Sequence, residues 1–299
     1  MRQVTSFRRS SLMWVFGSLL LVGLLLPTLS KASTGQCPGT TDHWYSPVSE
    51  NLADKAPLPC ETCEHPDNRQ NPACVVVRML ASEDCADGRC TNEQGDFWLD
   101  ADNGVAIQQS LRFRKPRKFP EDAGENCWFL LWALQPVVGV EQAGARDQRN
   151  YWELAYQAAS QRIEPPIPDA ELALVIQPAN RRSEHQLHIH ISRLNAAYRQ
   201  RVDALPVKPG EVQAFEFDGL AMRAVYVPDR SHEAPLQSWS VFELVQSILP
   251  GGASQMPRTG ILLVRSVDGR GFWVLAADGL MRTMLQLSAK PDCKLKLPQ

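Results

Sequence analysis

The clearest pattern of polar and apolar residues in this chain lies between Gln186 and Ser192. Polar residues occupy positions 186, 188, 190 and 192, and aliphatic residues occupy 187, 189 and 191. Successive side chains of a β-strand point to opposite faces. We therefore predict a strand with an aliphatic face in the core and a polar face that carries His188 and His190, two of the six histidines.

The other periodic segments predict an α+β fold with a mainly antiparallel sheet and packed helices. The short loop between the strands at 171–177 and 186–192 favours antiparallel pairing of those two strands. Capping residues and 3.6-residue periodicity predict helices at 150–163, 194–204 and 240–248. Alternating or continuous apolar runs predict further strands at 75–80, 127–140, 212–217, 220–227, 261–265 and 272–276, and a hairpin at 96–107.

The first 33 residues have the pattern of a targeting segment. Arg2, Arg8 and Arg9 precede a run at 12–26 that is almost entirely apolar, and Ser30 and Ala32 offer small residues to a signal peptidase. A cleaved signal peptide and a retained membrane anchor both stay open. Either one predicts an exported protein that is periplasmic, anchored in the inner membrane or associated with the membrane.

Eight cysteines follow that segment and agree with export to an oxidising compartment. We predict disulfides, with zinc as the competing interpretation of Cys60 and Cys63 or of Cys85 and Cys90. Cys293 stands alone near the C-terminus, and we expect it to pair with Cys74. Residues 34–127 are interpreted as a cysteine-rich loop and hairpin region that contributes to the domain, and 128–299 as its core.

Charge excludes one class of partner. The formal net charge is -2, and no basic repeat with interleaved aromatic residues occurs, so we do not expect nucleic acid to bind. The one cationic run, at 112–118, is interpreted as a solvated loop, with contact to anionic lipid headgroups as the alternative. The sequence makes no prediction of oligomeric state.

The histidine strand is the candidate site of chemistry. A neutral imidazole is a good nucleophile toward phosphorus, and a phosphorylated imidazole is a good leaving group. The polar loop with Asn180, Arg182 and Ser183 could donate hydrogen bonds to phosphate oxygens. A structural histidine pair and a metal site are the alternatives, although 191–195 offers no third ligand and His185 falls on the opposite face of the strand.

The run Gln186-Leu187-His188-Ile189-His190-Ile191-Ser192, together with 150–158 and 176–183, resembles the CDP-diacylglycerol pyrophosphatase branch of the histidine-triad superfamily. The likeness extends over about 150–293. It implies a histidine-triad-like fold and hydrolysis of CDP-diacylglycerol to CMP and phosphatidate without a metal or other cofactor. The substrate would be met at a membrane surface.

The resemblance also implies roles for single residues. His188 matches the nucleophile of the triad, His190 matches the third histidine, and Ser183 matches a hydroxyl that contacts the phosphate or the leaving group. Gln186 stands where the superfamily has the first histidine, which is a departure. The residues expected to contact the substrate are Gln177, Asn180, Arg182 and Gln186. Because of that departure, the alternative function is a noncatalytic, disulfide-stapled periplasmic binding protein on the same fold.

Overall fold

A computed structural model of the chain describes residues 85–86, 89–92, 95–109, 127–135, 137, 139–141, 149–179, 181–182, 184, 186–217, 219–279, 285–286 and 293–296. The chain divides into two units, Met1–Gly35 and Gln36–Gln299, and every described residue belongs to the second. The predicted leader and the predicted strand at 75–80 therefore lie outside the described residues. No helix among the described residues is long and apolar enough to cross a membrane.

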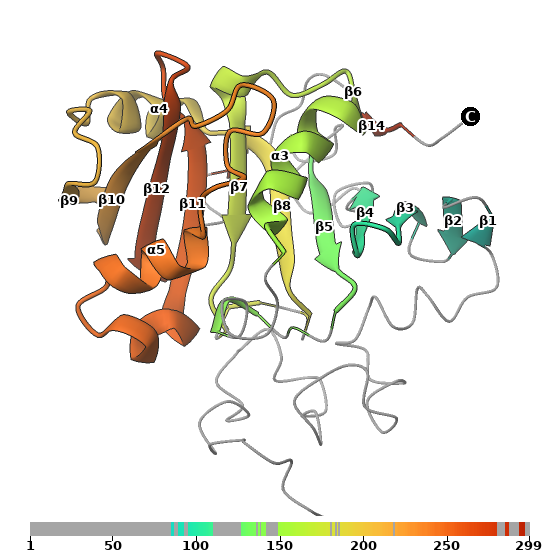
Figure 1. Cartoon of the computed structure of the whole chain (residues 1–299), viewed down its shortest axis with the longest axis horizontal. Helices are drawn as coiled ribbons and strands as arrows, with labels where there is room; N and C mark the ends of the chain where they lie inside the picture. The colour runs from blue at the N-terminus through green and yellow to red at the C-terminus, as the bar shows by residue number, and fades with distance from the viewer. Residues whose placement is uncertain are drawn as a thin grey trace, which may run out of the picture. The chain divides into compact units, whose positions relative to one another are not determined.

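An antiparallel sheet forms the centre of the described chain (Figure 1). Its strands follow the order β1-β2-β3-β4-β5-β8-β7-β11-β12-β10-β9, and β13 pairs with β8 outside that path. The first five strands are β1 (Cys85–Ala86), β2 (Arg89–Asn92), β3 (Gly95–Asp100), β4 (Val105–Gln109) and β5 (Phe129–Ala133). The others are β7 (Leu172–Ile176), β8 (His188–Leu194), β9 (Val212–Phe217), β10 (Leu220–Pro228), β11 (Thr259–Arg265), β12 (Gly271–Asp278) and β13 (Leu285–Gln286). A separate pair joins β6 (Ile163–Glu164) to β14 (Lys294–Leu295).

This sheet confirms the prediction of a mainly antiparallel α+β fold. The hairpins β3–β4, β9–β10 and β11–β12 form where turn residues separate two apolar runs. In the first of them Gly104 has φ +66°, a conformation that most other residues avoid. The predicted strand at 127–140 is too long, because β5 ends at Ala133.

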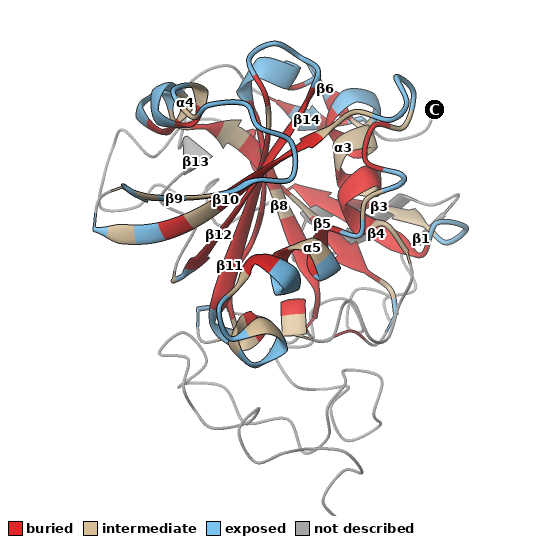
Figure 2. Ribbon diagram, turned by 60° about the vertical axis from the view of Figure 1, so that its left-hand side comes forward, coloured by how far each residue is buried: buried red, intermediate tan, exposed pale blue. Residues whose placement is uncertain are grey.

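Helices cover both faces of the sheet. The helices α3 (Tyr151–Gln161) and α5 (Val241–Ile248) pack their apolar sides on the face that carries Ile189 and Ile191. The helix α4 (Ala196–Asp203) packs on the opposite face through Tyr198 and Val202. Two short 3-10 helices, η4 (Asp169–Glu171) and η5 (Gly252–Arg258), precede β7 and β11. Figure 2 shows that the strands between these layers are mostly buried.

The start of α3 is fixed from two directions, and α3 packs behind β7 and β8. The Asn150 side chain accepts the Glu153 N–H at 3.1 Å and donates to the carbonyl of Leu236 at 2.6 Å. The buried Glu153 carboxylate accepts the Leu236 N–H at 2.7 Å. Burial raises the pKa of Glu153, and the hydrogen bond from Leu236 works against that rise.

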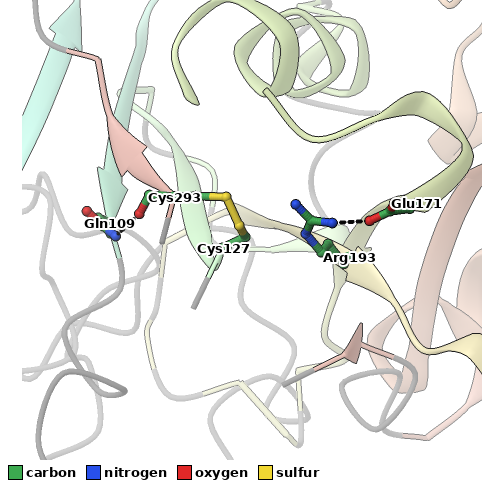
Figure 3. Close-up of a disulfide and its surroundings, with 5 residues drawn as sticks. All are labelled: Gln109, Cys127, Glu171, Arg193 and Cys293. Carbon is green, nitrogen blue, oxygen red and sulfur yellow. Dashed lines mark hydrogen bonds and ion pairs between the residues drawn. A yellow bond between two sulfur atoms is a disulfide. The ribbon is translucent and has the colours of Figure 1, made fainter. Parts of the chain in front are cut away.

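The predicted partner of Cys293 is wrong. Cys293 is bonded to Cys127, across 166 residues of sequence, and the two Cα atoms lie 4.8 Å apart (Figure 3). The Gln109 side chain donates to the carbonyl oxygen of Cys293 at 2.7 Å. The C-terminal segment is therefore held at β4 and at Cys127, two residues before β5, rather than at Cys74. Sequence spacing could not show whether Cys293 pairs with Cys74 or with Cys127, because the fold of the sheet brings Cys127 and Cys293 together across 166 residues.

Removing this disulfide should lower the stability of the protein. A bond that closes a loop of this length restricts the unfolded chain, so we expect the Cys127→Ser/Cys293→Ser double variant to lose roughly 3–5 kcal/mol of unfolding free energy. Chemical unfolding under nonreducing conditions measures the loss. The double variant avoids leaving one reactive thiol, and an unfolding midpoint equal to that of the parent protein would contradict the assignment.

Candidate active site

Strand β8 lies inside the sheet, between β5 and β7. Its residues Ile189 and Ile191 are fully buried in the core beneath α3. His188 lies opposite Trp132 of β5, and His190 lies between Leu130 of β5 and Val175 of β7. The predicted division of this strand into an aliphatic face and a histidine face is therefore confirmed. A strand paired on both sides holds its side chains more rigidly than a loop does.

A backbone carbonyl fixes the orientation of His188. The Nδ1 atom of His188 lies 2.8 Å from the carbonyl oxygen of Gln186. A carbonyl oxygen only accepts hydrogen bonds, so Nδ1 must carry the hydrogen. In the neutral ring the lone pair is then on Nε2. This is the tautomer that a nucleophilic imidazole needs.

The Gln186 side chain anchors the segment that precedes His188. Its Nε2 atom donates to the carbonyl oxygens of Ala133 at 2.5 Å and Gln135 at 3.1 Å, and the residue is 3% exposed. Backbone bonds from the Leu187 N–H to the Val137 carbonyl and from the Ala133 N–H to the Leu187 carbonyl run beside it. The amide of Gln186 thus ties this segment to the end of β5, and its predicted contact with the substrate stays a prediction.

His190 is partly exposed and lies beside His188. The two ring centroids are 5.0 Å apart, and the rings are inclined at 71°. The Trp128 indole Nε1 lies 3.0 Å from Nδ1 of His190. His190 is therefore placed to contact a group that His188 also reaches.

The sequence alone did not identify Trp128 and Trp132 as neighbours of the two histidines. The Trp132 ring lies against His188, with centroids 4.6 Å apart, and its indole donates to the buried Gln108 side chain at 3.1 Å. Trp128 and Trp132 are four residues apart, and that spacing puts both on one face of a strand. The spacing was visible in the sequence, but nothing local indicated that this strand pairs with β8.

The loop between β7 and β8 is held by a buried ion pair. The Arg182 guanidinium lies 2.7 Å from the Glu141 carboxylate, and the two side chains are 5% and 2% exposed. A Cβ atom at Gly139 would lie 2.0 Å from the Arg182 guanidinium, so any larger residue there would displace Arg182 from its position beside Glu141. Arg182 is not a solvated surface residue, and the ion pair gives it a role in positioning the loop. Its contact with phosphate stays a prediction.

The remaining predicted residues stand as follows. Gln177 is buried and follows β7 by one residue, on the histidine side of Val175 and toward the His188 end of β8. Asn180 and Ser183 lie outside the described residues, as does His185. Within the described part of the chain, no three His, Cys, Asp or Glu side chains converge as metal ligands would.

The anchoring role of Gln186 predicts the result of an isosteric change. In Gln186→Glu a carboxylate would face the carbonyl oxygens of Ala133 and Gln135, and we expect a loss of about 2–4 kcal/mol at pH 7. The introduced carboxyl should have a raised pKa, because only its protonated form can donate. The loss should therefore shrink as the pH falls toward 4, as measured by denaturation at several pH values.

Gln135→Glu is the matched control, because Gln135 is exposed and receives the same change in charge. It should leave stability nearly unchanged. Equal losses from the two variants would contradict the anchoring role of Gln186.

Comparison with known protein families shows which family the chain belongs to. The profile of the family described as CDP-diacylglycerol pyrophosphatase matches residues 119–290, which is more than half of the 299-residue chain. The matched range contains β5, the loop of Arg182, the histidine strand and the β11–β12 hairpin. The chain therefore belongs to the CDP-diacylglycerol pyrophosphatase family and is a hydrolase.

Proposed function

We propose that this protein hydrolyses the pyrophosphate bond of CDP-diacylglycerol to CMP and phosphatidate, with His188 as the nucleophile. Family membership supports the substrate class. One observation carries the role of His188: its Nδ1 lies 2.8 Å from the Gln186 carbonyl oxygen, which leaves the lone pair on Nε2. A covalent intermediate then divides one slow displacement into two faster ones.

In the first step Nε2 of His188 attacks the α-phosphorus, next to cytidine. The new N–P bond forms as the bond from that phosphorus to the bridging oxygen breaks. The bridging oxygen keeps the electron pair and leaves on phosphatidate. The attacking ring becomes positively charged, and its Nδ1–H still donates to the Gln186 carbonyl, which favours that charge.

In the second step water attacks the same phosphorus. The N–P bond breaks, its electron pair returns to Nε2, and CMP leaves with the oxygen of the water. The protons of the water pass to solvent or to the product phosphate. His188 ends in its starting tautomer, because the Gln186 carbonyl holds hydrogen on Nδ1 throughout.

The glutamine at position 186 is compatible with turnover. The group of Gln186 that orients His188 is its backbone carbonyl, and every residue type supplies one at this position. The geometry therefore gives no reason to expect that Gln186 abolishes activity. Family membership also favours an enzyme over a noncatalytic binding protein.

His188→Ala tests the nucleophile. With CDP-diacylglycerol in detergent micelles and EDTA present, we expect CMP release to fall by roughly a thousandfold or more, as for loss of a nucleophile. The control is His232→Ala, since His232 is an exposed histidine in the loop between β10 and α5 and should keep full activity. Unchanged CMP release by His188→Ala would show that His188 is not the nucleophile. Loss of the parent protein's activity in EDTA would point instead to a metal-dependent reaction.

Two wider assignments belong to the same proposal. The alternating histidines on an interior strand of an antiparallel sheet support membership of the histidine-triad superfamily. The apolar run at 12–26 supports export and action at a membrane surface, where a lipid nucleotide would reside. Fractionation of producing cells tests location, and recovery of the protein with cytosolic markers would contradict it.

A further inference from the structure

Trp128 is held firmly next to the histidine strand. It is 1% exposed, and Phe129, the next residue, pairs with Ile191 of β8. Cys127, the residue before it, is bonded to Cys293 (Figure 3). A covalent bond on one side and a strand pairing on the other thus fix the backbone of Trp128. Its indole makes an edge-to-face contact with His190, with ring centroids 5.4 Å apart.

The hydrogen bond between these rings has only one possible direction. An indole Nε1–H donates and never accepts, so Nδ1 of His190 must accept the bond of 3.0 Å. In the neutral ring the hydrogen of His190 is then on Nε2. His188 has the opposite assignment, because its Nδ1 faces a carbonyl oxygen. The two neighbouring imidazoles are therefore held in opposite tautomers by two different partners.

We infer that Trp128 is a positioning residue of the reaction: its indole keeps His190 as a neutral imidazole that presents an Nε2–H to the phosphoryl group. This inference rests on the function proposed above. His188 supplies a lone pair to phosphorus, and His190 supplies a hydrogen bond to a phosphoryl or bridging oxygen as negative charge builds there. No proton is transferred by His190, because a neutral imidazole acts here as a hydrogen-bond donor rather than as an acid.

The tautomers can be measured without turnover. In the parent protein labelled with ¹⁵N-histidine, NMR should show the His188 hydrogen on Nδ1 and the His190 hydrogen on Nε2. His188→Ala and His190→Gln assign the signals by their loss. A His190 ring with hydrogen on Nδ1, or the same tautomer at both positions, would overturn the inference even if the enzyme is active.

Kinetics test whether the indole N–H matters to the reaction. We expect Trp128→Phe to lower kcat by roughly five- to tenfold, the effect of losing one hydrogen bond, with KM changed less than twofold. Trp273→Phe is the matched control, because Trp273 is buried in the same apolar cluster on this face but three strands from β8. A kcat for Trp128→Phe equal to that of the control would overturn the role.

A second replacement separates the hydrogen bond from the shape of the ring. Site-specific incorporation of benzothienylalanine at position 128 replaces the indole N–H by sulfur and keeps the bicyclic outline, so the core stays filled if Trp128→Phe does not fold. We expect the same fall in kcat from this variant, and full activity would overturn the inference. Failure of the proposed function can be told apart from failure of this inference. In the first case His188→Ala would stay active while the tautomers measured by NMR were as expected.

Discussion

The hydrogen bond from His188 to the carbonyl of Gln186 is the interaction on which the proposed chemistry depends. It spans 2.8 Å between two residues of one short segment, at the point where the chain enters β8. The carbonyl holds its position because the Gln186 amide is tied to Ala133 and Gln135 and because Leu187 is bonded to Val137. The end of β5 thus sets the geometry of the nucleophile.

Strand β5 and the residue that precedes it also supply the groups that contact the two histidine rings. Trp132 lies against His188, and Trp128 donates to His190. Behind the strand pair, α3 packs its apolar side on the opposite face, and a disulfide at Cys127 holds the start of β5. The result is a rigid frame in which two chemically identical rings take opposite hydrogen-bonding roles. An arrangement of this kind requires little reorganisation when charge develops on a bound phosphate.

Local patterns in the sequence predicted much of this frame. The alternation from Gln186 to Ser192 identified the histidine face, and the capping residues at Asn150 and Ser240 located the starts of α3 and α5. The contacts that remained hidden join segments far apart in the chain. Trp128 meets His190 across 62 residues, and Cys127 meets Cys293 across 166. Periodicity reports which face a side chain occupies, but it does not report which strand lies next to it. Arg182 illustrates the same limit. It lies in the loop between β7 and β8, and its partner Glu141 lies 41 residues earlier, after β5.

The stereochemistry at phosphorus tests the covalent intermediate most directly. The substrate would be CDP-diacylglycerol made chiral at the α-phosphorus with sulfur, and hydrolysis would be run in ¹⁸O-labelled water. Attack by His188 followed by attack of water inverts that phosphorus twice. The account therefore predicts CMP analogue with retained configuration. Inverted product would mean that water displaces phosphatidate in one step, and His188 would not be the nucleophile.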